Sequence, residues 1–343
     1  MKIRKILKRL LQLHPKSIDL SLDRIKRLLK DLNNPEKKIN NAIQVVGTNG
    51  KHSLCVTLRE IFETAGYTVN LNTSPSLRKF NERYFLSGKY ISDEKLLDLL
   101  TEVEKINQGK SITYHEFICA CFFLAASRTN SDVNILESGL FFRLDASNVL
   151  EKNICSVVMP IGIDHKDFLK EGTIDEIVYE KCSHLLNDSK IVISKQTNGV
   201  IEKIKKNIAT NTSKKIIYGE HYNYQKNTKG FIYNDKIGSM NLGHPNLLGD
   251  FQISNISTAI ATIRNLDQFK ISESHIAKAI TKIRCEGRLQ NITQGKLRKY
   301  VSKNNRIIID GAHNVLAALA IRKYLDALDK EKKIFMVLGM MIN

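Results

Sequence analysis

The chain has 343 residues, 42% of them hydrophobic, and a formal net charge of +18. This length allows one large domain and part of a second, and no run of 18 apolar residues predicts a membrane-spanning helix. The six cysteines are scattered without a C-x-x-C pair, which argues against a zinc site or a disulfide framework and favours free thiols in the cytoplasm.

The basic charge allows three interpretations, and the first of them is binding to a nucleic acid. Lysines that bind a nucleic acid usually cluster on a recognisable module, whereas these are spread along the whole chain. The charge is also explained by a composition rich in Lys, Asn and Ile, or by a surface that attracts anionic substrates. We therefore expect small-molecule substrates, and neither a nucleic acid nor a membrane, as partners.

The N-terminal 17 residues contain six basic side chains and no acidic one. Such a segment resembles a transit peptide, but it lacks a small-residue cleavage site, and residues 10–13 are too short for a secretory apolar segment. An ordinary basic helix is the favoured interpretation. Apolar residues at helical spacing between positions 20 and 32 predict a second helix.

Strand and helix patterns then alternate as far as residue 194. Strands are predicted at 43–46, 69–71, 133–136, 154–159 and 191–194, and helices at 54–65, 93–106, 116–126 and 174–186. This alternation predicts an α/β fold with a mostly parallel sheet covered by helices. Ligands of such sheets bind beyond the carboxyl ends of the strands, so we expect the residues that follow these strands to meet there.

The pattern changes after residue 215. Short strands at 216–218, 231–233 and 237–240 predict a small antiparallel appendage, and a helix is predicted at 253–265. Later, a strand at 307–309, a helix at 315–328 and a strand at 334–338 predict the start of a second α/β domain. We therefore divide the chain into residues 1–287 and residues 288–343.

A glycine-flanked turn follows the first predicted strand. It reads Gly47-Thr48-Asn49-Gly50-Lys51-His52-Ser53 and leads into the first helix of the alternating region. Backbone N–H groups at such a turn face a common anion, the glycines allow close approach, and Lys51 supplies a charge for the β- and γ-phosphates. The turn departs from the G-x-x-x-x-G-K-[ST] pattern, so a plain glycine-rich turn is the alternative to a nucleotide phosphate site.

This turn resembles the phosphate loop of the Mur ligase superfamily, and most of all that of its folate branch, the folylpolyglutamate synthases and dihydrofolate synthases. Further motifs follow in the family's order, and the resemblance covers residues 18–343. They are Thr73-Ser74-Pro75 with Asn81-Glu82-Arg83; Leu136 to Leu140 with Arg143 to Asn148; Ile163-Asp164-His165; Glu180-Lys181; Leu248-Gly249 with Gln252 and Asn255; Gly287 to Gln290; and Asp310 to Asn314.

The resemblance implies a Mur-ligase-like ATPase domain and an ATP-dependent amide ligase. Such an enzyme adds L-glutamate to dihydropteroate, to folates or to both through an acyl phosphate, and it uses magnesium because this ion bridges phosphate oxygens. Three alternatives stay open: a Mur-type ligase with another carboxylate acceptor, an inactive nucleotide-binding remnant, and a basic RNA-binding protein. We expect a monomer.

Catalytic roles are implied for Lys51, Glu137, His165 and Lys181. A carboxylate directly after a strand, as at Glu137, is a natural magnesium ligand, and a helix-cap role is its plain alternative. The implied metal site also includes Ser53, Ser74 and His165, although imidazole is a poor first choice for magnesium. The resemblance makes Lys181 a carbamate for a second divalent ion, where a solvated helix-face lysine is the alternative. It also allows a monovalent cation.

Substrate contacts are implied on both sides of this metal site. The nucleotide contacts are Gly47, Thr48, Asn49, Gly50, Lys51, His52, Ser53, Gln252, Asn255, Arg288, Asp310 and His313. The acceptor contacts are Ser21, Leu22, Asp23, Ser74, Arg83, Thr113, Tyr114, His115, Glu116, Leu144, Asp145 and Ala146. Segment 285–290 resembles the family's interdomain hinge, so domain closure would bring Arg288 to phosphate.

The chain departs from the family pattern at several positions. His52, Ser76, the pair Phe141-Phe142 and Glu286 stand where relatives usually have Gly, His, Gly-Gly and Pro, and His115 stands at an aromatic position. We expect altered tuning rather than an inactive enzyme, because the residues for the metal and the triphosphate remain. Family members continue beyond the position of Asn343, so the resemblance predicts a C-terminally truncated sequence.

Overall fold

The computed structural model describes residues 2–16, 18–328, 331 and 333–339. Its helices are α1 (Lys2–Leu10), α2 (Asp23–Asp31), α3 (Lys51–Thr64), α4 (Asp93–Asn107), α5 (Tyr114–Ser127), α6 (Ile174–Cys182), α7 (Val200–Asn207), α8 (Asp250–Arg264), α9 (Glu273–Ile280) and α10 (Val315–Asp326). Its strands are β1 (Ala42–Val46), β2 (Val69–Asn72), β3 (Tyr84–Leu86), β4 (Lys89–Tyr90), β5 (Val133–Glu137), β6 (Cys155–Val158), β7 (Lys190–Ile193), β8 (Lys214–Ile217), β9 (Tyr222–Asn227), β10 (Gly230–Asp235), β11 (Gly238–Gly243), β12 (Gln290–Asn291) and β13 (Ile308–Ile309).

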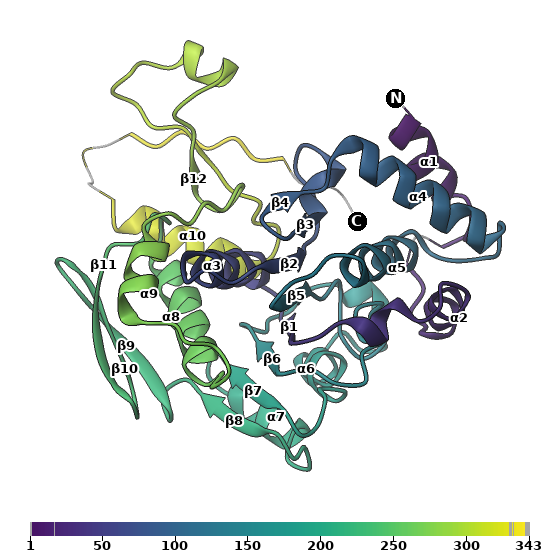
Figure 1. Cartoon of the computed structure of the whole chain (residues 1–343). Helices are drawn as coiled ribbons and strands as arrows, with labels where there is room; N and C mark the ends of the chain where they lie inside the picture. The colour runs from purple at the N-terminus through teal and green to yellow at the C-terminus, as the bar shows by residue number, and fades with distance from the viewer. Residues whose placement is uncertain (1, 17, 329–330, 332, 340–343) are drawn as a thin grey trace.

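An eight-stranded sheet forms the centre of the molecule (Figure 1). Its strand order is β4-β3-β2-β5-β1-β6-β7-β8. The last six strands in this order pair in parallel, whereas β3 pairs antiparallel with both β2 and β4. Every residue of β1 and β5 is buried, as expected for parallel strands covered on both faces. The predicted α/β class with a mostly parallel sheet is confirmed.

Helices cover both faces of this sheet (Figure 1). On one face, Ile43 and Val45 of β1 pack in a core with α3, α8 and α9. On the other face, Val46 packs in a core with α6 and α7, and α1, α2, α4 and α5 form a third apolar cluster. Successive strand residues point to opposite faces, so the β-branched run of β1 contributes to both layers. The expected basic N-terminal helix is α1.

Strands β9, β10 and β11 form a separate antiparallel sheet that packs on α8 and α9. The predicted appendage is confirmed, but the assignment of 216–218 to it is wrong. Ile216 and Ile217 belong to β8, which extends the parallel sheet beside β7 and buries both side chains. A short apolar run satisfies an edge strand and a hairpin equally well, so the sequence pattern did not separate the two.

The part beyond residue 287 is less regular than predicted. β12 and β13 pair antiparallel through Gln290 and Ile309, and α10 follows. The predicted strand at 334–338 is wrong, because the described residues 333–339 form no strand and Val337 is 98% exposed. An apolar run becomes a strand only when a neighbour pairs with its backbone, and β13 pairs with β12 instead. The predicted end of the chain, at 340–343, lies outside the described residues.

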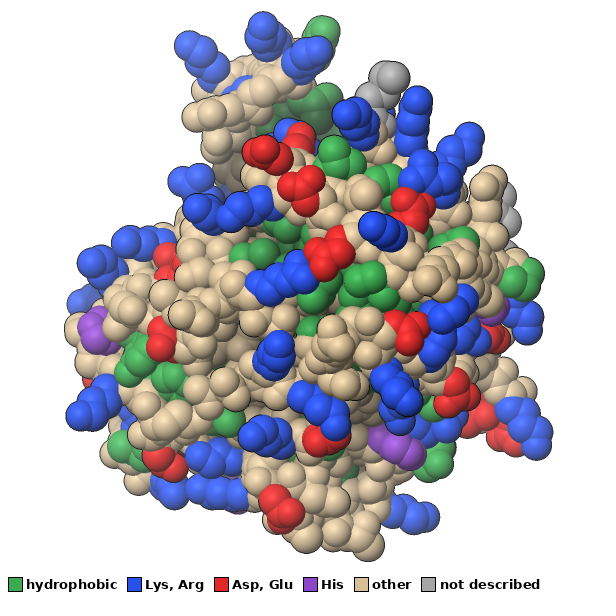
Figure 2. Space-filling view, turned by 45° about the vertical axis from the view of Figure 1, so that its right-hand side comes forward, with side chains coloured by type: hydrophobic (Ala, Val, Ile, Leu, Met, Phe, Trp, Pro, Cys, Tyr) green, Lys and Arg blue, Asp and Glu red, His purple; other side chains and the backbone are tan. Residues whose placement is uncertain are grey.

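Within the described residues, no helix is long and apolar enough to cross a membrane. Lysine and arginine side chains are scattered over the visible face and do not gather into one patch (Figure 2). A nucleic-acid surface would concentrate them on one face or along one groove. The face shown in Figure 2 carries no such concentration of basic side chains.

Candidate active site

A cavity of about 640 Å³ lies beyond the carboxyl ends of β1, β5 and β6, and α10 also lines it. This volume is in the range of small-molecule sites. The predicted site residues that line it are Ser21, Thr48, Asn49, Gly50, Lys51, His52, Ser53, Ser74, Arg83, Thr113, Tyr114, His115, Glu116, Glu137, Leu144, Asp145, Ala146, His165, Asn255, Arg288, Asp310 and His313. The structure thus brings together side chains separated by nearly the whole length of the chain.

The turn between β1 and α3 requires its glycines. Gly47 and Gly50 have φ angles of 143° and 83°, which side chains with a Cβ rarely adopt. A Cβ on Gly47 would lie 2.7 Å from Met159 Cβ, and one on Gly50 would lie 2.8 Å from Asn255 Oδ1. The Thr48 N–H donates to Pro160 O at 2.9 Å and anchors the turn to the loop after β6. The predicted strand–turn–helix cradle is therefore present.

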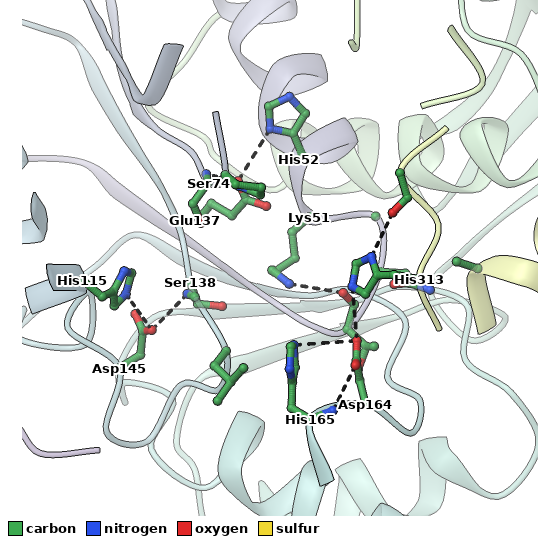
Figure 3. Close-up of a pocket in the computed structure, with 18 of the residues that line it drawn as sticks. Lys51, His52, Ser74, His115, Glu137, Ser138, Asp145, Asp164, His165 and His313 are labelled. Atoms are coloured by element: carbon green, nitrogen blue, oxygen red, sulfur yellow. Dashed lines mark hydrogen bonds and ion pairs between the residues drawn. The ribbon is translucent and has the colours of Figure 1, made fainter. Parts of the chain in front are cut away.

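Lys51 lies inside this turn. Its Nζ donates to Gly47 O at 2.9 Å and to Thr48 O at 3.2 Å. Burial lowers the pKa of Lys51, while the negative charge of Glu137 acts in the opposite direction. Figure 3 shows the Lys51 side chain between the His52–Glu137 pair and the group formed by Asp164, His165 and His313.

The Glu137 carboxylate ends β5 and is 6% exposed. Its Oε2 accepts a hydrogen bond from the Ser74 N–H at 2.9 Å and lies 3.7 Å from His52 Nδ1. Burial alone would raise the pKa of Glu137, but the hydrogen bond and charge of His52, with Lys51 and the Ser74 amide, lower it overall. The carboxylate of Glu137 is therefore ionised at neutral pH. The Ser74–Pro75 peptide bond, also at this end of the cavity, is cis.

His52 places an imidazole where the family resemblance implies a glycine. Burial opposes its positive charge, but Cys285 and Glu137 together raise the pKa of His52 to about 10. The Cys285 side chain comes from the segment that resembles the interdomain hinge, and its Sγ lies 3.6 Å from Ser53 Oγ. The departure at position 52 thus adds a cation beside Glu137 and a contact between the phosphate loop and the hinge.

Asp164 joins side chains from both parts of the chain. Its Oδ2 accepts a hydrogen bond from Asn314 Nδ2 at 2.8 Å and lies 3.8 Å from His165 Nε2 and 3.7 Å from His313 Nε2. Asn314 and Asn49 exchange side-chain amide hydrogen bonds at 2.9 and 3.0 Å. Sequence reasoning assigned no role to Asp164 or Asn314. Their positions directly beside His165 and His313 in the motifs are the signal that points to them.

Lys181 of α6 lies beneath the phosphate loop and does not line the cavity. It is 2% exposed, and its Nζ donates to Gly47 O at 3.0 Å and to Leu140 O at 2.7 Å. Burial, assisted by the charge of Lys51, lowers the pKa of Lys181 to about 7. The Nζ also lies 5.4 Å from the ring centroid of Phe141, one of the residues that depart from the family pattern. The solvated-lysine alternative is therefore wrong.

We expect the buried amine of Lys181 to make stability depend on pH. The folded-state pKa is about 7 and the ordinary value is 10.5, so the unfolded chain binds more protons between these pH values. Relative to Lys181→Met, the free energy of unfolding of the wild type should rise with pH across this window, by at most about 1.4 kcal/mol per pH unit. Urea unfolding of both proteins at pH 7.5 and 9.5, in bicarbonate-free buffer, measures the difference. Equal differences at the two pH values would contradict the lowered pKa.

The end of the cavity where the acceptor contacts were predicted is built around Asp145. Its Oδ2 accepts from the Gly139 N–H at 3.0 Å and lies 3.2 Å from His115 Nε2, and its Oδ1 accepts from the Ser147 N–H at 2.9 Å. Burial would raise the pKa of Asp145, but His115 and Ser147 lower it overall. The side chain of His115 is 36% exposed and that of Asp145 is 3% exposed. His115 is therefore the group of this pair that a ligand in the cavity can contact.

Glu116 serves the local structure at the same end. It accepts from Arg24 Nε and Nη2, both at 3.0 Å, and from the Thr113 N–H at 2.7 Å. Together with the Thr113 hydroxyl it forms a capping box at the start of α5. Its carboxylate thus fixes Tyr114 and His115 at the first turn of a helix that lines the cavity.

Five predicted site residues do not line the cavity: Leu22, Asp23, Gly47, Lys181 and Gln252. Leu22 packs against the apolar cluster of α1, α2, α4 and α5. Asp23 begins α2, and its N–H donates to Ser21 Oγ at 3.1 Å. Gln252 is fully buried behind Asn255 and accepts from its Nδ2 at 3.0 Å. Leu22, Asp23 and Gln252 can therefore act on a ligand only through their neighbours.

The donor set fits a magnesium ion bound to phosphates. Within the described residues, no three His, Cys, Asp or Glu side chains lie close enough together to hold an ion alone. Magnesium takes one or two carboxylates and fills its other positions with water and phosphate oxygens. Glu137 can provide a carboxylate, and the phosphate loop can hold the phosphates. Burial lowers the pKa of His165 and favours its neutral, metal-binding form.

Comparison with known proteins identifies similar chains. No protein-family model matches the sequence. The chain is 32% identical over 302 residues to the dihydrofolate synthase/folylpolyglutamate synthase of Buchnera aphidicola subsp. Acyrthosiphon pisum, with 87% of this chain and 68% of that protein covered. It superposes on E. coli FolC in complex with DHPP and ADP with a TM-score of 0.85 and 29% identity, covering 96% of this chain and 75% of that chain.

A further solved structure adds a metal. The bifunctional folylpolyglutamate synthase/dihydrofolate synthase of Yersinia pestis, complexed with AMPPNP and Mn ion, superposes with a TM-score of 0.82 and 26% identity. That match covers 94% of this chain and 74% of the Yersinia chain. The similarity therefore extends over both the large sheet and the part beyond residue 287.

Proposed function

The chain belongs to the dihydrofolate synthase/folylpolyglutamate synthase family, and we propose that it adds L-glutamate to dihydropteroate, to folates or to both at the expense of ATP. One observation carries the proposal. The glycine-bounded turn with Lys51 and the ionised Glu137 share a single cavity with a separate acceptor end around His115 and Asp145. A phosphate-binding region and an acceptor region in one cavity are what acyl-phosphate chemistry needs.

The reaction proceeds in two steps. A carboxylate oxygen of the acceptor attacks the γ-phosphorus of ATP, the bond to the β-phosphate oxygen breaks, and ADP leaves. The amino nitrogen of L-glutamate then attacks the acyl carbon, releases a proton to solvent and expels phosphate. The loop N–H groups and Lys51 hold the phosphates and neutralise the charge that moves toward the β-phosphate oxygen.

Magnesium would supply positive charge that neutralises the phosphate oxygens. Glu137, Ser53, Ser74 and His165 are the residues that we assign to this ion. The divalent metal is supported by the Mn ion in the Yersinia pestis structure and by the ionised state of Glu137. We assign the nucleotide to the phosphate loop, Asn255, Arg288, Asp310 and His313.

We further propose that Lys181 carries a carbamate that holds a second divalent ion. Only a neutral amine adds CO₂, and the lowered pKa of Lys181 supplies one near neutral pH. Its Nζ also lies beside the carbonyl of Gly47, at the edge of the phosphate loop. A carbamate at this position would therefore place negative charge next to bound phosphates and ions.

Lys181→Ala should lose ligation by at least about tenfold and regain part of it with added acetate or formate, because small carboxylates replace the missing anionic oxygens. The rescue is measured as turnover with and without added carboxylate at roughly 50 mM, about ten times a dissociation constant of a few millimolar. Lys51→Ala is the matched control, since it also removes a site ammonium but should not respond. Carbon-13 NMR in labelled bicarbonate reports the carbamate directly. Full activity of Lys181→Ala, with no carbamate signal in the wild type, would refute the assignment.

Further parts of the proposal concern the whole protein. We propose a cytoplasmic monomer that does not bind nucleic acid, and a domain division at residues 287 and 288. The scattered lysines support the absence of a nucleic-acid partner (Figure 2). Light scattering tests the monomer, and a steep salt dependence of oligonucleotide binding would contradict the absence of a nucleic-acid partner.

Assays that omit one reactant at a time test the function. The purified chain should release ADP and phosphate only when ATP, Mg²⁺, L-glutamate and a dihydropteroate or folate acceptor are all present. Equal ADP release without any acceptor would refute the ligase assignment. Nucleotide binding with no turnover under any condition would instead favour the inactive remnant.

A further inference from the structure

One ring nitrogen of His115 is unused at the end of the cavity where the acceptor contacts were predicted (Figure 3). The other nitrogen, Nε2, lies 3.2 Å from Asp145 Oδ2 and 3.7 Å from Cys119 Sγ. No hydrogen bond joins Nδ1 to any residue that the structure describes. The two nitrogens of an imidazole ring point in different directions, and the His115 side chain is 36% exposed. Nδ1 is therefore the polar atom of this ring that a ligand can reach.

The Asp145 carboxylate has no position left for a ligand. Its Oδ2 accepts from the Gly139 N–H at 3.0 Å and from His115, and its Oδ1 accepts from the N–H and the hydroxyl of Ser147 at 2.9 and 2.5 Å. An ionised carboxylate offers about four lone-pair sites, and these donors fill them. Because such a carboxylate only accepts hydrogen bonds, His115 Nε2 must carry a proton.

The surrounding backbone holds this pair in place. A Cβ on residue 139 would lie 2.7 Å from Asp145 Oδ2 and 2.9 Å from His115 Nε2, so the close approach of the two side chains needs the glycine in the loop after β5. On the other side, the capping box of Thr113 and Glu116 fixes His115 in the first turn of α5. The direction of the ring is thus set by two separate elements.

The buried charge of Asp145 requires a positive partner. The Asp145 side chain is 3% exposed, and a buried charge without a counter-charge is strongly destabilising. Among the ion pairs of the described residues, Asp145 takes part in one, with His115. Burial opposes the positive charge of His115, but Cys119 and Asp145 together raise the pKa of His115 well above its ordinary value. An imidazolium has an N–H at both nitrogens, so Nδ1 offers a donor to the cavity.

The other carboxylates at this end of the cavity are also engaged. Glu116 accepts from Arg24 Nε and Nη2, both at 3.0 Å, and Asp19 Oδ2 accepts from Arg24 Nη1 at 2.8 Å. Leu144 and Ala146 line the cavity beside them and add apolar surface. Among the described lining residues of this end, a ligand therefore meets a free charged donor but no free carboxylate.

We propose that His115 determines which acceptor the cavity takes, by donating its Nδ1–H to an oxo group on the ring of the acceptor. The inference rests on the proposed function for the identity of that acceptor, a pteridine whose ring carries such an oxygen. An amino group in place of the oxo group would turn an N–H donor toward the Nδ1–H. The site would then reject the amino compound by an unfavourable contact as well as by a lost hydrogen bond.

Binding of two acceptors that differ in this one group tests the proposal. The probes are pteroate and the analogue in which an amino group replaces the ring oxo group, each titrated into the full chain by calorimetry. The wild type should bind pteroate at least about tenfold more tightly, because the lost hydrogen bond involves a charged donor. His115→Phe keeps a planar ring but has no donor, so the ratio should fall to about threefold or less.

Two further measurements exclude a general effect of the substitution. His184→Phe is the matched control, since His184 is exposed beyond the end of α6 and lies outside the cavity, and its binding ratio should equal that of the wild type. Nitrogen-15 NMR examines the wild type itself. Both ring nitrogens of His115 should be protonated at neutral pH, and the Nδ1 signal should shift when pteroate is added.

The outcomes separate this inference from the ligase function. A wild-type ratio near one, an unchanged ratio in His115→Phe, or an Nδ1 signal that pteroate does not move would overturn the proposal. Turnover of both acceptors with equal kcat/KM would overturn the specificity but leave the ligase function in place. A binding ratio that depends on His115, together with no turnover of either acceptor, would support the specificity and contradict the ligase function.

Discussion

Lys51→Ala is expected to lower kcat/KM for ATP by at least about 100-fold, which corresponds to about 2.7 kcal/mol of lost transition-state stabilisation. The ammonium of Lys51 lies within the phosphate loop, bonded to the carbonyls of Gly47 and Thr48. It is the charge best placed to follow the γ-phosphoryl group during transfer. Alanine leaves the loop glycines intact, so the acceptor end should keep its affinity.

Steady-state release of phosphate measures this effect. Lys105→Ala on the exposed side of α4 is the matched control, and it should behave as the wild type. Thermal unfolding of both variants shows that each is folded. A Lys51→Ala enzyme with turnover within about threefold of the wild type, against the 100-fold expected for a lost phosphate contact, would place the phosphate elsewhere.

Glu137→Gln is expected to reduce turnover by at least about 100-fold and to remove its response to Mg²⁺ or Mn²⁺. The substitution keeps the shape of the side chain and an oxygen for the Ser74 N–H, which donates at 2.9 Å. What it removes is the negative charge, which is held ionised by His52 and Lys51. The loss should therefore report metal binding rather than folding.

Metal titrations of turnover and Mn²⁺ binding by EPR measure the two parts of this prediction separately. Glu94→Gln, an exposed residue in the first turn of α4, is the matched control. Weakened Mn²⁺ binding with normal unfolding would support the assignment of Glu137. Undiminished Mn²⁺ affinity in Glu137→Gln would assign the metal to other ligands.

The central sheet and the phosphate loop were predictable because their signals are local. A β-branched run, two glycines and a helical apolar spacing follow one another between residues 43 and 65, and each constrains the backbone directly. The same holds for β5 with Glu137 at its end. Parallel pairing then brings the ends of β1, β5 and β6 together without further information.

Other features depend on contacts between distant segments, which local patterns do not encode. The apolar run at 216–217 fits an edge strand and a hairpin equally well, and only its pairing with β7 decides. The run at 334–338 has strand composition but no partner among the described residues. The pairing of Asp164 with Asn314 spans 150 positions. Gln252 lies at a helical spacing from Asn255, yet burial directs it into the core.

Asn314 has a consequence for how the two parts of the chain move together. Its side-chain oxygen accepts from the Ala317 N–H at 2.9 Å, so it is the N-cap of α10 as well as the partner of Asn49 and Asp164. An N-cap contributes about 1 kcal/mol to its helix. A shift of the phosphate loop that pulls Asn314 away would therefore fray the first turn of α10, the turn that carries Leu316 into the cavity. The beginning of one helix is thus tied to the position of a loop that precedes it by more than 260 residues.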